Sequence, residues 1–537
     1  MSAQRRRLLV VTAILVVAAT TAVGASAARH GQRVANAGTT LVVAAANTPT
    51  TMDPEFIAGG PQGWEMDNVI YDEKIYYKTN RATGTRNFTQ FEPRLFASWQ
   101  KSADGKTWTF HLRKGAKSNL GNEFTSADIV WSFQRAFALK GLGYFLAIQA
   151  NLTKPENVVA VDKYTVQFKL DAPILLFLHQ MTLVYHAPFD TTEVKKHTSK
   201  DDPWATKWLG THAAGYGSYY IDSFVSGQQV VLKRNPNFYG PKPYFDTVIY
   251  KAVPDPSSRA ALLKSGDVDI AEGLSPEQLN SVKSDPKIAI TATQGNTLMA
   301  VIPNEKKAPL DNVLVRKALN FATPYEQILN DIYKGYADAT QTTLPPIYPG
   351  YLGKVLPYKM DIAKAKALMK QSGVKTPLNL SITFAPFDPT FEQVSIALRT
   401  AWQQIGVNLT LNQVTPARFQ QLTASRGYDM LLPVSLSSHN ADPLYTMEIF
   451  SGGPPRSCCN WGNWVDKAIF AIFDKAHVEQ NPATYLKLVK QIQRMQQANP
   501  PWVIMGARKW TVAHAKDVKG FIWSPQESIW FNELTRG

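Results

Sequence analysis

The sequence of 537 residues lacks the short motifs that mark most enzyme families. It contains no H-E-x-x-H, C-x-x-C, G-x-x-x-x-G-K-[ST] or G-x-S-x-G pattern, and its nine histidines never stand four residues apart, as two metal ligands on one helix face would. These absences predict a protein that is not an enzyme and that holds no cofactor and no metal. A Ser-His-Asp triad assembled from distant residues leaves no local pattern, so a secreted hydrolase stays an alternative.

Cysteine is nearly absent as well. The two that occur, Cys458 and Cys459, are adjacent, and in an exported protein they could oxidise to a vicinal disulfide that stiffens its loop. The alternative is a pair of thiols with no role in binding. The sequence leaves both interpretations open.

The chain also lacks a cluster of positive charge outside its N-terminus. Lys and Arg number 57 against 42 Asp and Glu, but no three consecutive basic residues occur after Arg5-Arg6-Arg7. Removing residues 1–28 takes away those three arginines and no acid, which lowers the formal charge from +15 to +12. Because a nucleic-acid-binding surface needs clustered basic residues, nucleic acid is not expected as a partner.

A long apolar run occurs only at the N-terminal end. Arg5-Arg6-Arg7 precede the mostly apolar residues 8–23, and Ala25-Ser26-Ala27 offers the small residues that signal peptidase requires. The run is shorter than the ~20 apolar residues that span a bilayer, so a signal peptide over residues 1–28, cleaved near Ala27, is favoured over a membrane anchor. Export by the Sec or the twin-arginine route stays open. No cysteine follows the run, so we expect a free periplasmic protein without a lipid anchor.

Residues 91–135 are the most informative stretch of the chain. Asp104-Gly105 is a turn dipeptide between two apolar runs, and apolar and polar residues alternate over 108–112, which predicts a β-hairpin with one buried face. The segment Thr125 to Asp128 is typical of a helix N-terminus, and apolar residues recur at the helical period over 129–137. We therefore expect a hairpin covered by a helix.

The same stretch resembles a known family. The strings P-x-L-x-x-S-W at 93–99, D-G-K-T-W-T-F-x-L-R-K-G at 104–115 and F-T-x-x-D-I-V-x-S-F at 124–133 are similar to the signature of family 5 extracytoplasmic solute-binding proteins, the large peptide, nickel and opine receptors of ABC importers. The resemblance implies an α/β fold of the two-lobe periplasmic-binding-protein type II class, with an extra subdomain in lobe I. It also implies a monomer that binds its solute between the lobes and has transmembrane permease subunits as partners.

Length alone predicts more than one hydrophobic core. Together with the resemblance, the length predicts a domain organisation of a signal peptide over 1–28, lobe I over 29–300 with the extra subdomain at about 80–210, lobe II over 301–505, and a return to lobe I over 506–537. From about residue 300 strands and helices alternate, which favours a doubly wound layer. In lobe I residues 64–78 look helical, and in lobe II residues 428–434 look like a strand.

Ligands of open α/β sheets bind beyond the carboxyl ends of strands, which here indicates the loops after Phe384 and Val434. In dipeptide-binding members, the resemblance implies, an arginine before a proline holds the peptide carboxylate, and an aspartate three residues before a D-P pair holds the ammonium. This chain has Ala385-Pro386, and His439 stands three residues before Asp442-Pro443. Both end clamps are absent, which argues against free dipeptides held by their termini.

His439 is the central candidate. It could hydrogen-bond a neutral or anionic group or bind a metal chelate, and the alternative is a histidine satisfied within its own loop. Asp442 is expected to be only a helix N-cap, and Trp461 could stack on a ring or belong to the core. The candidate ligand-binding residues are Met52, Ala385, Phe387, Leu436, Ser437, Ser438, His439, Asn440 and Trp461.

The sequence thus predicts a periplasmic receptor that captures a peptide or peptide-like solute between two lobes and delivers it to the permease of an ABC importer. Receptors for opines, glycosides or metal chelates are alternatives of the same class. A secreted hydrolase and a periplasmic chaperone are alternatives of other classes.

Overall fold

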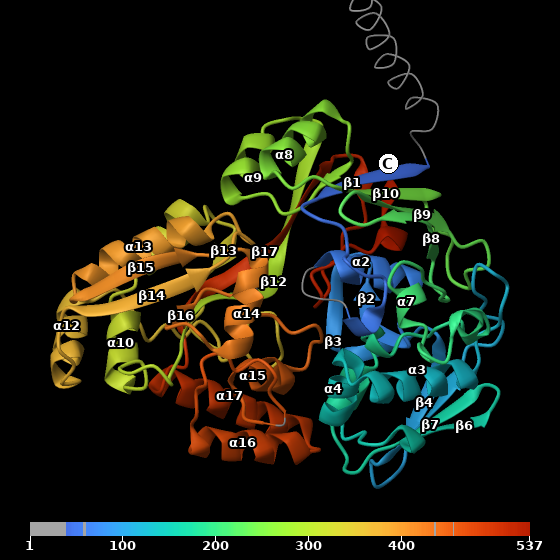
Figure 1. Ribbon diagram of the computed structural model, residues 1–537, viewed down its shortest axis with the longest axis horizontal. Coiled ribbons are helices and arrows are strands. Elements are labelled where there is room, and N and C mark those ends of the chain that lie inside the picture. The colour runs from blue at the N-terminus through green and yellow to red at the C-terminus, as the bar shows by residue number, and fades with distance from the viewer. Residues whose placement is uncertain (1–38, 57–60, 434–435, 455) are drawn as a thin grey trace, which may run out of the picture.

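The computed structural model describes most of the chain, and the predicted signal peptide lies outside the described residues. Figure 1 shows two bodies, which we call lobe I and lobe II, joined by two long strands. Lobe I contains residues 39–287 and 516–537, and lobe II contains residues 304–502. The described residues are 39–56, 61–433, 436–454 and 456–537.

One sheet runs through both lobes. Its strands are β1 (Thr40–Ala45), β8 (Tyr219–Val225), β9 (Gln229–Arg234), β10 (Thr247–Ala252), β11 (Ile270–Ala271), β12 (Ile288–Pro303), β13 (Ala337–Asp338), β14 (Leu378–Phe384), β15 (Val407–Gln413), β16 (Met430–Leu431) and β17 (Val503–Ala515). Their order is β15-β14-β16-β12-β17-β11-β1-β10-β9-β8, with β13 paired to β17. The sheet is therefore continuous from the outer edge of lobe II to that of lobe I.

Strands β12 and β17 connect the lobes. They pair antiparallel from Ile288 opposite Ala515 to Val301 opposite Val503, with register shifts between Gln294 and Thr297 and between Met299 and Ala300. Because such irregularities bend a strand, the connection is a two-stranded ribbon with built-in bending points. Both predicted lobe boundaries fall inside these continuous strands, so the division at 300/301 and 505/506 stays a prediction.

The predicted hairpin and helix of residues 91–135 are confirmed. β4 (Phe96–Lys101) and β5 (Thr107–Leu112) form the hairpin, and with β6 (Val158–Asp162) and β7 (Thr165–Lys169) they make a separate sheet of order β4-β5-β7-β6. The Thr125 N–H donates to Asp128 Oδ2 at 2.7 Å where α3 (Ser126–Leu139) begins. Ile129 and Phe133 of α3 belong to one buried cluster with Phe110 of the hairpin, so the helix covers the hairpin.

Helices cover the sheets on both lobes (Figure 1). In lobe II, β14 and β15 are parallel and α13 connects them in a βαβ unit, which agrees with the alternation of strands and helices expected from about residue 300. The helices of eight or more residues, besides α3, are α2 (Pro61–Ile70), α4 (Leu142–Gln149), α8 (Pro256–Ser265), α10 (Val313–Phe321), α12 (Ile362–Gln371), α13 (Phe391–Gln403), α14 (Pro416–Ser425), α15 (Pro443–Ser451), α16 (Lys467–Val478) and α17 (Pro482–Ala498).

Two expected elements differ. The helix expected over 64–78 ends at Ile70, and β2 (Ile75–Asn80) pairs with β3 (Thr85–Pro93). The run Ile75-Tyr76-Tyr77 suits a strand, and all three side chains are buried. The strand expected over 428–434 is shorter: among residues 428–433 only β16 is a strand, and residue 434 lies outside the described residues. Asn304 Nδ2 donates to the Tyr428 carbonyl, and Ser381 Oγ donates to Asp429 Oδ2.

Candidate functional site

The candidate site is the segment 436–442, which leads from β16 to α15 at the boundary between the lobes. Its first residue is tied to the connecting ribbon, since the Leu298 N–H donates to the Leu436 carbonyl at 3.4 Å. Its last residue caps α15: Asp442 Oδ1 accepts from the Tyr445 N–H at 2.8 Å, and the Tyr485 hydroxyl donates to the same carboxylate. The predicted capping role of Asp442 is confirmed.

On the side that faces lobe II, Ser438 makes hydrogen bonds to other protein groups. The Ser438 hydroxyl donates to the Asn440 carbonyl at 2.7 Å and lies 3.0 Å from the Tyr348 hydroxyl. Asn296 Nδ2, in the connecting ribbon, donates to the Ser438 carbonyl at 2.9 Å. Ser438 therefore holds the segment in shape. Asn440 differs, because its Nδ2 is buried without a partner among the described residues.

His439 points the other way, toward lobe I. Its ring lies 4.5 Å from that of Trp64 in α2, and its Nδ1 lies 3.3 Å from the Tyr185 hydroxyl of the extra subdomain. Burial lowers the pKa of His439 to about 4, so the imidazole is neutral at neutral pH. When the Tyr185 hydroxyl donates to Nδ1, the neutral ring carries its proton on Nε2. The Nε2–H group is then a hydrogen-bond donor.

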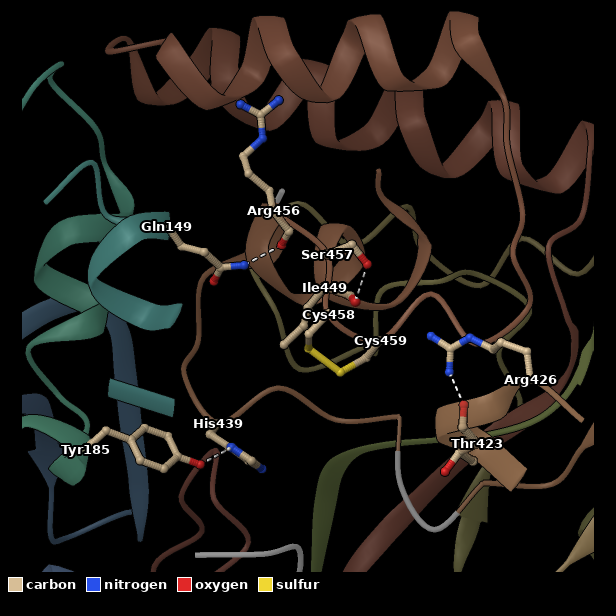
Figure 2. Close-up of a disulfide and its surroundings, with 10 residues drawn as sticks. All are labelled: Gln149, Tyr185, Thr423, Arg426, His439, Ile449, Arg456, Ser457, Cys458 and Cys459. Atoms are coloured by element: carbon tan, nitrogen blue, oxygen red, sulfur yellow. Dashed lines mark hydrogen bonds between the residues drawn. A yellow bond between two sulfur atoms is a disulfide. The ribbon is translucent and has the colours of Figure 1, made fainter. Parts of the chain in front are cut away.

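Two further hydrogen bonds connect the lobes on either side of this histidine. The Ala441 N–H donates to the Tyr77 hydroxyl at 2.7 Å, and that hydroxyl lies 3.0 Å from His179 Nδ1. On the other side, Gln149 Nε2 at the end of α4 donates to the Arg456 carbonyl, as Figure 2 shows. His439 thus lies between lobe I aromatic rings and the lobe II segment, with hydrogen bonds between the lobes on both sides.

The segment next to the Gln149 contact contains the two cysteines, which form a disulfide bond with each other. Figure 2 shows this disulfide between α15 and the Tyr185–His439 pair. The Cys459 N–H and the Ser457 hydroxyl both donate to the Ile449 carbonyl, at 3.1 and 2.7 Å. The disulfide segment is therefore fastened to α15 while Cys458 is exposed.

We predict that the exported protein contains no free thiol. Iodoacetamide should leave the denatured, unreduced protein unmodified, and it should add two carbamidomethyl groups after reduction, because the two cysteines of the chain are bonded to each other. Intact-mass spectrometry measures both. A Cys458→Ser variant is the control, since it exposes one thiol to iodoacetamide without reduction. Two thiols alkylated in the unreduced wild-type protein would contradict the bond.

The other candidates are placed as follows. Trp461 packs against a buried cluster of lobe II that contains Leu436 and Ala385, and its carbonyl accepts from the Tyr428 hydroxyl at 2.6 Å. Phe387 is exposed, with its ring 5.6 Å from Phe419. Met52 is buried in the core of lobe I. Ser437 is partly exposed beside His439.

Trp64 and Tyr185 are site residues that the sequence does not indicate. Trp64 is the first residue of the stretch expected to be helical, and Tyr185 lies in a short 3₁₀ turn, Val184–His186, that has no recognisable pattern. Their rings are 4.6 Å apart and lie edge to face. Nothing local in either segment shows that it meets residue 439.

The described residues contain neither a cluster of metal ligands nor a helix that could cross a membrane. Over residues 39–56, 61–433, 436–454 and 456–537, His, Cys, Asp and Glu nowhere form a group of three or more that could hold a metal ion. Within the same residues, every helix is too short or too polar to cross a membrane.

Comparisons with known proteins agree with the arrangement of the lobes. The family model for bacterial extracellular solute-binding proteins, family 5 (middle), matches residues 90–457. The chain is 28% identical over 497 residues to the probable D,D-dipeptide-binding periplasmic protein of Escherichia coli K12, covering 92% of this chain and 93% of that protein. It is 25% identical over 505 residues to the dipeptide-binding protein of the same organism, covering 90% and 92%.

Solved structures share the fold. The ABC transporter-associated periplasmic binding protein of Helicobacter pylori, in complex with the peptide STSA, superposes with a TM-score of 0.81 at 22% identity, over 93% of this chain and 98% of that one. The agropinic acid complex of an Agrobacterium tumefaciens periplasmic binding protein gives a TM-score of 0.78 at 21% identity, over 93% and 99%. Such likeness shows the two-lobe type II fold, which was the predicted fold class.

Proposed function

Because the chain belongs to the bacterial extracellular solute-binding proteins of family 5, we propose that it is the periplasmic receptor of an ABC importer and captures a peptide or peptide-like solute between its lobes. The observation that carries the proposal is the enclosure of His439. This lobe II residue is in contact with Trp64 and Tyr185 of lobe I, so a solute beside it touches both lobes at once.

Such contacts couple binding to closure. A solute that touches both lobes binds the closed form more tightly than the open form, and therefore shifts the population toward the closed form. The ribbon of β12 and β17, with its two register shifts, is the part of the chain that would bend. The closed receptor would then present the solute to the permease subunits.

The protein groups near residue 439 favour an uncharged group of the solute at this position. A neutral imidazole offers one donor and one acceptor but no counter-charge for an ammonium. Ala385 is buried and apolar where an arginine would hold a carboxylate. We therefore expect a peptide-like solute whose backbone amides or hydroxyls, rather than its two charged ends, meet lobe II.

The test is to identify what the protein carries. Small molecules released from purified protein by denaturation are analysed by mass spectrometry, and a panel of di- and tripeptides, opines, glycosides and metal chelates is screened by thermal shift. A released peptide-like compound that raises the melting temperature supports the proposal. Turnover of chromogenic esters would favour a hydrolase instead, and binding of denatured protein regardless of its length would favour a chaperone.

Replacing His439 by alanine should weaken the solute that the screen identifies at least several-fold, because the variant loses one hydrogen bond worth about 0.5–1.5 kcal/mol together with ring packing on Trp64. Isothermal titration calorimetry measures the change. The control is His111→Ala in the exposed hairpin, which should bind like the wild type. Unchanged affinity of the His439 variant would assign this residue to the structure of its loop.

The remaining features are proposed on the same footing. We infer that residues 1–28 are removed on export by the Sec or twin-arginine route, that the mature protein is a free monomer in the periplasm, and that it performs no chemistry on its solute. The lobes would divide within β12 and β17, near residues 300 and 505.

A further inference from the structure

The face of α2 that carries Trp64 carries a second polar residue. Trp64, Asp67 and Tyr71 are spaced three and four residues apart, so their side chains lie along one face of the helix. The Trp64 ring contacts His439 and Tyr185, and the Tyr71 hydroxyl donates to the Met52 carbonyl at 3.2 Å. Asp67 therefore lies one turn from Trp64, on the face of α2 that is turned toward the site.

The acid on the opposite face of α2, Glu65, makes a hydrogen bond through one oxygen, although its Oε2, like Asp67 Oδ2, is buried without a partner among the described residues. Glu65 Oε1 accepts from the Ile529 N–H at 3.0 Å, and the neighbouring Asn68 Nδ2 donates to the Ser528 hydroxyl. Asp67 is 1% exposed, and its Oδ2 has no hydrogen-bond partner among the described residues. A buried carboxyl without a partner is costly and requires an explanation.

The two described cations packed on this side of α2, Arg135 and Lys74, have other partners. Lys74 Nζ donates to the Leu183 carbonyl at 2.6 Å and to the His186 carbonyl at 3.2 Å. The guanidinium of Arg135 binds both oxygens of Asp53 and donates from Nε to the Trp204 carbonyl at 3.0 Å. Burial, with the charges of Asp53 and Glu73, raises the pKa of Asp67 well above its ordinary value, which favours the neutral form of this carboxyl in the empty protein. The titratable and charged groups packed on this side of α2 are Asp53, Glu55, Tyr71, Glu73, Lys74, Arg135, Tyr185 and His439.

We propose that Asp67 is the counter-charge for a cationic group of the solute, an ammonium in a peptide, that enters beside Trp64 and Tyr185. The inference rests on the proposed receptor function and deepens it. The aromatic faces of Trp64 and Tyr185 attract a cation, and the neutral His439 does not repel it. Lobe I would thus bind the positively charged end of the solute. The lobe II segment would not, because position 439 is a histidine and not an acid.

The pairing has a proton balance that can be measured. When the ammonium binds, the neutral Asp67 carboxyl releases its proton to solvent and the carboxylate pairs with the cation. Binding therefore releases about one proton, and affinity falls about tenfold for each unit that the pH drops below the pKa of Asp67. A role confined to packing would give neither effect.

The experiment compares the wild type with Asp67→Asn, in which an amide of the same shape carries no charge. The probes are an equimolar dipeptide library and the same library N-acetylated, and native mass spectrometry reads what each protein retains. The control is Glu65→Gln, on the opposite face of the same helix. We expect the wild type and Glu65→Gln to retain free-amine dipeptides at least tenfold better than the acetylated ones, and Asp67→Asn to lose this preference while its melting temperature is not lowered.

The possible results distinguish the role of Asp67 from the receptor function. Retention of acetylated dipeptides as well as free ones by the wild type, or an unchanged preference in Asp67→Asn, would overturn the role of Asp67 and leave the peptide receptor standing. Retention of neither library would overturn the inference, while the receptor function is judged separately by the small molecules that the purified protein releases on denaturation. For the dipeptide retained best, calorimetry in buffers of different ionisation enthalpy should show proton release by the wild type and none by Asp67→Asn, and release by both would assign the proton to another group.

Discussion

Replacing Arg135 by methionine is expected to lower the free energy of unfolding by about 3–5 kcal/mol, because it leaves a buried carboxylate without its partner. Arg135 and Asp53 are both almost completely buried, and Nη1 donates to Asp53 Oδ1 at 2.9 Å. The pair joins α3 of the extra subdomain to the loop after β1. Next to it are two more acids, Asp67 and Glu55, and burial raises the pKa of Glu55 to about 7.

The double variant Asp53→Asn with Arg135→Met separates charge from packing. Since it removes the unpaired charge along with the cation, it should recover most of the lost stability. Lys196→Met, which breaks an exposed pair with Glu193, is the control and should lower the free energy of unfolding far less. Urea and thermal unfolding measure all of these. An Arg135→Met midpoint equal to that of Lys196→Met would show that the pair does not stabilise the lobe.

The hairpin and helix of residues 91–135 could be predicted because their determinants are local. A turn dipeptide, an alternation of apolar residues and a hydroxyl N-cap with an acid three residues later all lie within the segment. The strand β2 could not be predicted in the same way. Its partner β3 carries polar residues over most of its length, so the pattern of either strand alone does not indicate the pair.

The candidate site shows the same limit more strongly. His439 could be chosen from the sequence because it replaces an acid that the family resemblance leads one to expect. Trp64 and Tyr185 lie 375 and 254 residues earlier in the chain, and they reach His439 only when the two lobes meet. In the sequence Asp67 resembles any other acid on a helix. The structure shows that Arg135 is paired with Asp53 and not with Asp67. Contacts created by domain closure have no local signature.

Replacing Gly217 by alanine is the second change from which we expect a large effect. Gly215 and Gly217 belong to the segment G-Y-G-S-Y, and Gly217 packs against the end of α2, where its N–H donates to the Ile70 carbonyl at 2.8 Å. A methyl group at 217 would lie 2.2 Å from the Val69 carbonyl oxygen and 2.6 Å from the carbonyl carbon of Ile70. These are backbone atoms that cannot rotate away, so the last turn of α2 must move.

The movement should affect stability and binding together. Overpacking of this kind costs about 1–3 kcal/mol or more, which thermal unfolding measures. Since α2 also carries Trp64 and Asp67, the dissociation constant of the solute should rise in the same variant, which calorimetry measures. Gly210→Ala is the matched control, because its nearest contact would be 3.3 Å and the backbone φ there is −58°. Destabilisation with unchanged affinity would mean that α2 repacks without moving Trp64, and it would contradict the predicted effect of the glycine segment on the site. Loss of both in Gly217→Ala, with neither lost in Gly210→Ala, would connect the glycine segment to the site through the position of one helix.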